Sequence, residues 1–281
     1  MTGARAIAAK PTLAVWKFAS CDGCQLSLLD CEEQLLALAD VIHIAHFSEM
    51  SSATTPGPFD VSLVEGSICT PSDAARIVRV RALSRHLVTI GACATSGGIQ
   101  ALRNFATPGS YAHSVYAHPE YLKSLETATS IASHVEVDYE LHGCPVDRGQ
   151  LLEVLFAFLA GRRPVIARHS VCQECKGRQW VCLLVSDGAA CLGPVTRAGC
   201  GALCPSIGRG CYGCFGPVDD ANTTSMLALL RQQGRGDDEI ARLFHTFNAA
   251  APAFQTRYEE LVGSSAPSTD PDSSQTRGGR P

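Results

Sequence analysis

The chain has 281 residues, a length that suits about two domains of roughly 100–200 residues each. Hydrophobic residues make up 46% of it and charged residues 18%, a composition that excludes an intrinsically disordered protein. The formal net charge of −4 argues against a nucleic-acid-binding protein, because such domains are usually strongly basic.

Segments typical of strands and of helices alternate over the N-terminal part of the chain. Strands are expected at residues 13–18, 41–47, 59–64, 86–90 and 132–141, and helices at residues 25–38, 72–84 and 147–159. Pro71 stands just before the second of these helices, where proline favours a helix start. Strands that alternate with helices predict an α/β fold built on a doubly wound, mostly parallel sheet.

The composition changes near residues 161–164. Beyond this point Gly, Pro and Cys dominate until about residue 220, and strand signals are few. One or two helices are expected within residues 221–249, with a break at residues 234–236. The last residues are rich in Ser, Pro, Asp and Gly, which is typical of disorder. The sequence therefore predicts a first domain over residues 1–163, a loop-rich domain over 164–262 and a disordered tail over 263–281.

Neither an export signal nor a membrane-spanning segment is expected. The N-terminus has no sustained apolar run and no twin arginine. The longest strongly apolar run, residues 151–160, is far shorter than the roughly 20 residues that a membrane helix needs. We therefore expect a cytoplasmic protein. Structural disulfides are rare in that compartment, so the 14 cysteines indicate bound metal rather than cross-links.

Four cysteines follow directly after predicted strands. Cys21 and Cys24 follow the first strand, Cys93 follows the fourth, and Cys144 follows the last. Because the carboxyl ends of parallel strands meet at one edge of a sheet, these thiols are expected to meet there. Four converging thiolates suit a 4Fe–4S cluster or a zinc ion, and the neighbouring glycines would let the backbone approach an inorganic core.

Other residues near this edge carry weaker signals. Residues 91–98 resemble a phosphate-cradling loop but lack the GK[ST] ending and the GxGxxG spacing, so a flavin or nucleotide site is only weakly indicated. Glu65 is interpreted either as a proton relay or as an ordinary loop carboxylate. Cys69 competes for a ligand position, and Cys31 is expected on a helix in the core. No triad or HExxH motif stands out, so no catalytic residue is expected in this chain.

Eight further cysteines crowd into a short C-terminal stretch. They are Cys172, Cys175, Cys182, Cys191, Cys200, Cys204, Cys211 and Cys214. A zinc ribbon would use four thiols and would be flanked by short β-hairpins. Eight thiols with intervening Gly-Pro turns and few strand signals favour two iron–sulfur clusters. Together with the first group, they predict three clusters that form an electron relay.

Five motifs together resemble the small subunit of [NiFe] hydrogenases. They are Cys21-Asp-Gly-Cys24-Gln, Val64-Glu-Gly-Ser67, Gly91-Ala-Cys93-Ala, Gly143-Cys144-Pro145 and Cys191-Leu-Gly-Pro-Val-Thr-Arg-Ala-Gly-Cys200-Gly-Ala-Leu-Cys204-Pro. The resemblance runs from about residue 12 to residue 220. It is greatest to the cytoplasmic, multimeric group, which includes the sulfhydrogenase delta subunit and the coenzyme-reducing hydrogenases of methanogens.

The resemblance implies a flavodoxin-like domain whose proximal 4Fe–4S cluster faces a nickel–iron centre in a separate large subunit. The implied ligands are Cys21, Cys24, Cys93 and Cys144 for the proximal cluster, Cys172, Cys175, Cys182 and Cys191 for the distal one, and Cys200, Cys204, Cys211 and Cys214 for the medial one. Exported relatives usually have a distal histidine ligand and a 3Fe–4S medial cluster held by three cysteines. Here Cys172 can replace that histidine and Cys204 adds a fourth thiolate, which implies three 4Fe–4S clusters. His169 is an alternative distal ligand that would leave Cys175 spare.

The implied function is electron transfer within a cytoplasmic [NiFe] hydrogenase, a complex in which this chain holds no hydrogen-activating site. Electrons would pass between the large subunit and a flavin or iron–sulfur reductase that serves NAD(P), or another low-potential carrier. The related subunit of respiratory complex I shares the N-terminal fold, but it characteristically uses a tandem Cys-Cys pair, which this sequence lacks. A zinc-stabilised interaction protein and a flavodoxin-like flavoprotein remain as alternatives.

Overall fold

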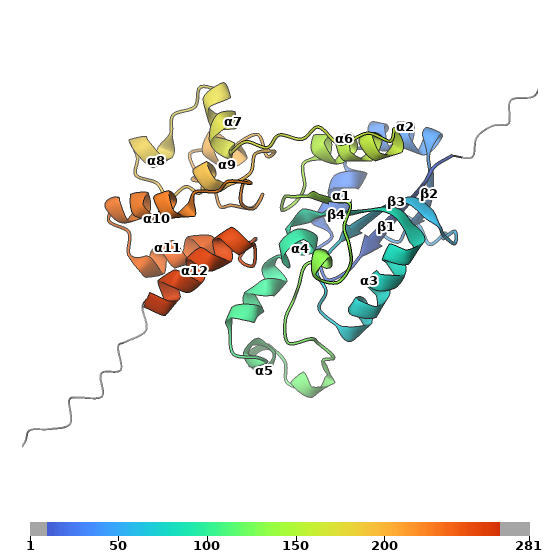
Figure 1. The fold of residues 1–281 in the computed structure, drawn as a ribbon, viewed down its shortest axis with the longest axis horizontal. Coiled ribbons are helices and arrows are strands. Elements are labelled where there is room, and N and C mark those ends of the chain that lie inside the picture. The colour runs from blue at the N-terminus through green and yellow to red at the C-terminus, as the bar shows by residue number, and fades with distance from the viewer. Residues whose placement is uncertain (1–9, 265–281) are drawn as a thin grey trace, which may run out of the picture.

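A parallel sheet lies at the centre of the computed structural model, which describes residues 10–264 (Figure 1). Within these residues the sheet has five strands, which from one edge to the other are β2 (His43–Phe47), β1 (Thr12–Lys17), β3 (Phe59–Glu65), β4 (Ser84–Ile90) and β5 (Tyr139–Leu141). The order 2-1-3-4-5 is that of a flavodoxin-like doubly wound sheet. The predicted α/β fold class is therefore confirmed.

Helices cover both faces of the sheet. Those on one face are α1 (Gly23–Leu29), α2 (Glu33–Val41) and α6 (Arg148–Leu159), and the main helix on the other is α3 (Pro71–Leu83). The first face buries Leu28, Leu38 and Leu151, and the second buries Ile77 and Val80. Because both faces are covered, nearly every residue of β3 is buried, as is typical of a parallel sheet.

Two N-terminal elements differ from the sequence prediction. The single helix expected at residues 25–38 is divided into α1 and α2, and Glu32 has a φ angle of +42° at the break. The turn lets apolar residues of both short helices reach one core, and it puts Cys31 between them rather than on a helix. The strand expected at residues 132–141 shrinks to β5, because only its last three residues pair with β4.

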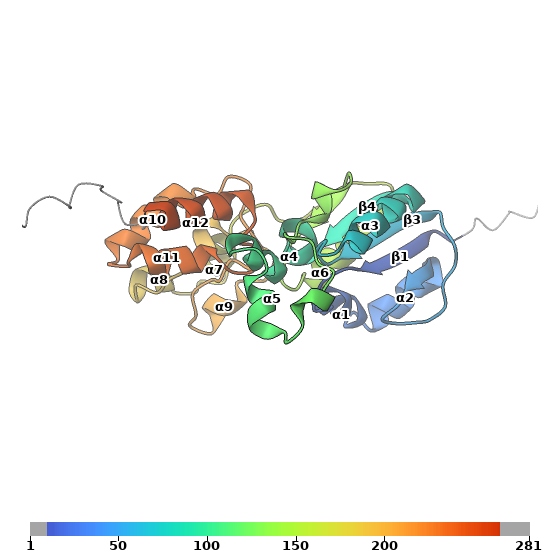
Figure 2. The same ribbon diagram turned by 90° about the horizontal axis from the view of Figure 1, so that it is seen from below.

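A connecting region follows β4 and leads to β5. It contains α4 (Gly91–Ser96), α5 (Ser110–Val115) and three short 3-10 helices (Ile99–Phe105, Pro119–Tyr121 and Ile131–Ser133). Figure 2 shows α4 and α5 between the sheet and the C-terminal helices. The helix that directly follows β4 therefore lies next to the cysteine-rich part of the chain.

The C-terminal region is helical and has its own core. Its helices are α7 (Val171–Gly177), α8 (Leu183–Ser186), α9 (Leu203–Ser206), α10 (Thr223–Gln232), α11 (Asp237–Phe244) and α12 (Pro252–Ser264), with a 3-10 turn at Gly193–Val195. Phe244 and Phe254 pack edge to face in this core, at a ring distance of 5.5 Å. The break expected at residues 234–236 separates α10 from α11, whereas α12 was not predicted.

Some expectations concern the chain ends. The structure does not describe residues 1–9 and 265–281. Most of the expected disordered tail lies there, and so does nearly all of the N-terminal segment in which no export signal is expected. Gly263 and Ser264 belong to α12. Within the described part of the chain, no helix combines the length and apolarity needed to cross a bilayer.

Candidate metal centres

The four N-terminal cysteines lie at the carboxyl edge of the sheet, where the strand pattern puts them. Cys21 follows β1, Cys24 stands in the first turn of α1, and Cys93 lies in α4 directly after β4. Cys144 follows β5. The doubly wound topology therefore gathers residues that are far apart in the sequence.

Glycines make room for two of these sulfurs. A Cβ atom on Gly91 would overlap the sulfur of Cys24, and one on Gly98 would lie 2.6 Å from the sulfur of Cys93. Both glycines have positive φ angles, +86° and +62°, which other residues rarely adopt. Any larger residue at either position would have to displace a thiol.

Burial and mutual repulsion disfavour the thiolate form of these cysteines. Burial raises the pKa of Cys24 far above its usual range, and the neighbouring Glu65 and Cys144 raise it further. Burial also raises the pKa of Cys93 to about 12, with added contributions from Cys144 and Cys21. Thiolates gathered here would need a compensating positive charge, so the donor set fits a cationic inorganic core.

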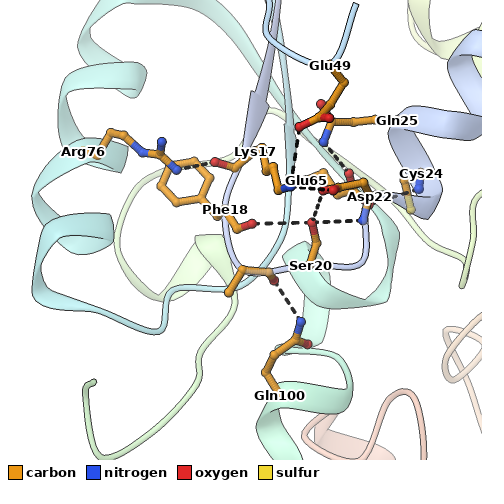
Figure 3. Close-up of polar contacts among 11 residues, drawn as sticks. Lys17, Phe18, Ser20, Asp22, Cys24, Gln25, Glu49, Glu65, Arg76 and Gln100 are labelled. Carbon is orange, nitrogen blue, oxygen red and sulfur yellow. Dashed lines mark hydrogen bonds and ion pairs between the residues drawn. The ribbon is translucent and has the colours of Figure 1, made fainter. Parts of the chain in front are cut away.

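Glu65 ends β3 inside this site (Figure 3). One carboxylate oxygen accepts a hydrogen bond from the Cys24 amide at 3.0 Å, and the other accepts one from the Gln25 side chain at 2.8 Å. The residue is only 2% exposed, and burial raises its pKa. Glu65 is therefore a buried residue at the sheet edge that fixes the start of α1, and not a loop carboxylate.

The loop that carries Cys21 is held on two sides (Figure 3). Gln100 donates from Nε2 to the Ala19 carbonyl at 3.0 Å, and its Oε1 lies 3.4 Å from the Cys93 sulfur. An ion pair joins Lys17 to Asp22 across the same loop. The Gln100 contacts tie the strand-end loop to the helix that carries Cys93, and the ion pair ties the loop to the end of β1.

One C-terminal group of cysteines surrounds a small cavity. Its members are Cys172, Cys175, Cys182 and Cys191, which all line a space of about 70 Å³ together with Trp180 and Pro205. Cys172 and Cys175 lie one turn apart on α7. Burial raises the pKa of Cys172 to about 11, and Cys191 and Cys175 add to the shift. A thiol-lined space of this kind fits an inorganic core, and the exposed Cys182 lies at its solvent side.

The second C-terminal group consists of Cys200, Cys204, Cys211 and Cys214. Burial raises the pKa of Cys214 to about 12, and its charged neighbours include Cys200 and Cys204. Burial likewise raises the pKa of Cys211, and the neighbouring Cys191 and Cys214 raise it further. Cys200, Cys204 and Cys211 therefore lie near Cys214, and Cys211 also lies beside Cys191 of the first C-terminal group.

Neighbouring groups are joined by cysteine pairs. Cys144 of the N-terminal group raises the pKa of Cys214 after the larger effects of burial and of Cys200. The amide of Cys211 donates a hydrogen bond to the sulfur of Cys191 at 3.2 Å. The three groups thus form a row from the sheet edge through the second C-terminal group to the thiol-lined cavity.

Asn248, which the sequence analysis did not single out, joins the two regions of the protein. Its Oδ1 accepts a hydrogen bond from the Ser96 hydroxyl in α4 at 2.8 Å. Its Nδ2 donates to the carbonyls of Gly213 and Cys214, at 3.0 Å each. The residue is 2% exposed. It therefore fixes the loop of Cys214 against the helix that carries Cys93.

Three other candidate residues lie outside these groups. Cys31 is buried, and its sulfur lies 3.4 Å from the Ser27 carbonyl oxygen, so its place in the core is as predicted. Cys69 is buried 3.3 Å from the Ser67 hydroxyl. His169 lies outside the lining of the cavity, with Nδ1 3.1 Å from the Ser170 carbonyl oxygen. Among residues 10–264, no set of three or more His, Cys, Asp or Glu side chains is placed to hold a single metal ion.

Comparisons with known proteins identify relatives of this chain. Residues 21–158 match the family described as NADH ubiquinone oxidoreductase, 20 Kd subunit. The chain is 35% identical over 235 residues to the Sulfhydrogenase 2 subunit delta of Pyrococcus furiosus, across 84% of this chain and 98% of that relative. The similarity therefore extends beyond the sheet into the cysteine-rich region.

Solved structures show the same fold. A chain from the NAD+-reducing [NiFe]-hydrogenase in the H2-reduced state is 30% identical with a TM-score of 0.52, over 56% of this chain and 95% of that one. A chain of the Dm. baculatum [NiFeSe]-hydrogenase is 18% identical with a TM-score of 0.52, over 78% and 98%. The second likeness concerns the fold alone, and it includes the helical C-terminal region.

Proposed function

The chain belongs to the family of [NiFe] hydrogenase small subunits and is an electron-transfer subunit of such a complex, and we propose that it holds three 4Fe–4S clusters. The clusters connect the nickel–iron centre of a large subunit with a partner that serves NAD(P) or another low-potential carrier. Iron–sulfur clusters supply one-electron redox chemistry when they are bound.

The row of three thiol groups supports this proposal most directly. Each group contains four cysteines. Cys144 of the first group contributes to the pKa shift of Cys214 in the second, and the Cys211 amide of the second donates to the Cys191 sulfur of the third. A chain with one structural metal site would need only one such group. A row that runs from the carboxyl edge of the sheet to the thiol-lined cavity suits a protein that conducts electrons between two partners.

The residues of this chain bind and orient the clusters. We assign Cys21, Cys24, Cys93 and Cys144 to the proximal cluster, Cys200, Cys204, Cys211 and Cys214 to the medial one, and Cys172, Cys175, Cys182 and Cys191 to the distal one. Backbone amides that point at ligand sulfurs, such as that of Gly213 at 3.5 Å from the Cys211 sulfur, stabilise negative charge on the cluster. The protein therefore sets the position and the potential of each cluster.

The proposal also includes the organisation of the chain. Residues 1–163 form the flavodoxin-like domain with the proximal cluster, and residues 164–262 form the domain with the other two. We propose a cytoplasmic location, in which a flavin or iron–sulfur reductase subunit is the second partner.

Metal and sulfide analysis tests the proposal. The chain, purified anaerobically with its partner subunits, is expected to contain roughly twelve iron and twelve sulfide per copy after correction for the partners. Cys93→Ala is expected to remove roughly four of these irons, whereas the matched control Cys31→Ala is expected to leave the iron and sulfide contents unchanged. Zinc without sulfide would identify an interaction protein, and flavin without iron would identify a flavoprotein; either result overturns the proposal.

A further inference from the structure

Glu174 joins the two C-terminal cysteine groups. It stands on α7 between Cys172 and Cys175, yet its carboxylate contacts the loop of the other group. One oxygen accepts hydrogen bonds from the amides of Gly199 at 2.9 Å and Gly201 at 3.2 Å. The other oxygen accepts one from the amide of Ala202 at 3.0 Å.

The geometry of α7 explains how one helix serves both groups. Residues three apart on a helix share a face, so Cys172 and Cys175 both reach the thiol-lined cavity. Glu174 is rotated from both of them by 100° or more at roughly 3.6 residues per turn, so it faces another neighbour. That neighbour is the loop around Cys200.

The loop needs support from outside itself. Gly199, Gly201 and Ala202 have φ angles of +139°, +63° and +53°. For Ala202, which carries a side chain, the left-handed conformation is unfavourable unless its surroundings hold it there. Three hydrogen bonds to one carboxylate supply that support, and they fix the backbone on both sides of Cys200.

The carboxylate also places charge near a proposed ligand. One oxygen of Glu174 lies 4.0 Å from the Cys200 sulfur. Arg178 lies close to the loop, with its guanidinium 2.8 Å from where a Cβ of Gly201 would be, and it stacks on Trp180 at 5.1 Å. Within residues 10–264, no Lys, Arg or His comes within 4.0 Å of the Glu174 carboxylate to form an ion pair. Its negative charge therefore opposes the addition of an electron beside Cys200.

We propose that Glu174 is a positioning residue, which holds the Cys200 loop on α7 and keeps the reduction potential of the adjacent medial cluster low. The inference rests on the proposed function, because it needs a cluster bound by Cys200. It concerns the link between two clusters. Glu174 extends from α7, which carries two proposed distal ligands, and it sets both the position of the Cys200 loop and the reduction potential of the medial cluster.

Redox titration of the wild type and three variants tests the inference. Glu174→Gln keeps the shape of the side chain but removes its charge, and we expect one of the three midpoint potentials to shift positively while the other two stay unchanged. Glu174→Asp keeps the charge on a shorter side chain, so we expect a smaller positive shift. The control Asp238→Asn removes an exposed charge from α11 and is expected to leave all three potentials unchanged.

Hydrogen exchange of the loop amides gives a second readout that does not depend on electron transfer. In the wild-type protein the amides of Gly199, Gly201 and Ala202 are expected to exchange slowly, and in Glu174→Gln they are expected to exchange at least about tenfold faster, a loss of roughly 1.4 kcal/mol of protection. Rapid exchange in the wild type overturns the inference even if the variant fails to fold.

The outcomes separate this inference from the proposed function. Wild-type protein without iron and sulfide contradicts the proposed function, and loop exchange still tests the hydrogen bonds of Glu174. If the wild-type protein holds three clusters, and Glu174→Gln has the same midpoint potentials and the same loop exchange rates as the wild type, only the role of Glu174 is contradicted.

Discussion

The carboxylate of Glu65 accepts a hydrogen bond from the backbone amide of Cys24 at 3.0 Å, so the end of β3 is tied to the first turn of α1. Gln25 donates to the other oxygen at 2.8 Å. In Glu65→Gln an amide oxygen can replace only one of these acceptors, and the new NH₂ group faces a donor. We expect a loss of about 1–3 kcal/mol in the free energy of unfolding.

Urea denaturation of the metal-free protein measures this loss. Glu33→Gln, which changes an exposed carboxylate in α2, is the matched control and is expected to stay within about 0.5 kcal/mol of wild type. Equal stability of the two variants would show that Glu65 does not fix the start of α1.

Gly91→Ala is expected to prevent assembly of the proximal site. The new Cβ would overlap the Cys24 sulfur, and the φ angle of +86° would itself be strained. Gly234→Ala is a close control, because Gly234 has a φ angle of +81° and nothing lies within 4 Å of its Cβ position. Both variants carry similar backbone strain, so a difference in iron content isolates the clash with Cys24. Equal iron content in the two proteins would contradict this account.

The sheet and the N-terminal cysteine group could be predicted because their signals are local. Thr70, Pro71 and Asp73 form a complete helix start, with the Thr70 hydroxyl accepting from the Asp73 amide and the Asp73 carboxylate accepting from the Thr70 amide. The strand-end cysteines needed only one further rule, that parallel strands end at the same edge. Local pattern and topology together were enough to bring Cys24 and Cys93 to one site.

The residues that join the regions could not be predicted, because their partners lie far away in the sequence and most of them are backbone groups. Glu174 reads as a spacer between two cysteines, and Asn248 as an ordinary loop residue, yet each makes three hydrogen bonds to distant groups. No side-chain pattern marks such backbone partners. The break between α1 and α2 was missed for a related reason, since the apolar spacing continues across Cys31.

Asn248→Ala is expected to loosen the contact between the two regions. The substitution removes three hydrogen bonds and leaves the buried carbonyl of Gly213 and the partly buried carbonyl of Cys214 without this donor. We therefore expect a loss of about 2–4 kcal/mol in the free energy of unfolding. Ser96→Ala removes only one of the three bonds and is expected to cost about 1 kcal/mol. Thermal unfolding measures the stability of both variants. Equal losses of stability in Asn248→Ala and Ser96→Ala would contradict the role of Asn248.

Asp138 is expected to make stability depend on pH at the edge of the sheet. Burial alone would raise its pKa, but the Leu87 amide at 2.7 Å and the Arg81 guanidinium at 2.6 Å together lower it below 3.8. A depressed folded-state pKa stabilises the protein above the unfolded value, and this contribution disappears as pH falls through the folded-state pKa. Asp138→Asn should therefore be less stable than wild type at pH 7, by about 1 kcal/mol, because the pair is partly exposed. The difference in the free energy of unfolding between the two proteins should narrow below pH 4. A difference that stays constant with pH would exclude this contribution of Asp138.

Cys204→Pro is expected to convert the medial cluster to a 3Fe form. Cys204 stands in the first turn of α9, where proline is tolerated because an amide there needs no helical partner. The ring replaces one proposed thiolate ligand and leaves Cys200, Cys211 and Cys214. The oxidised protein should then contain roughly one iron less and show the electron paramagnetic resonance signal of a 3Fe–4S cluster. Cys69→Ala removes a buried thiol outside the three groups and should leave both the iron content and the spectrum unchanged. An oxidised Cys204→Pro protein without a 3Fe signal, and with its full iron content, would remove Cys204 from the ligand set.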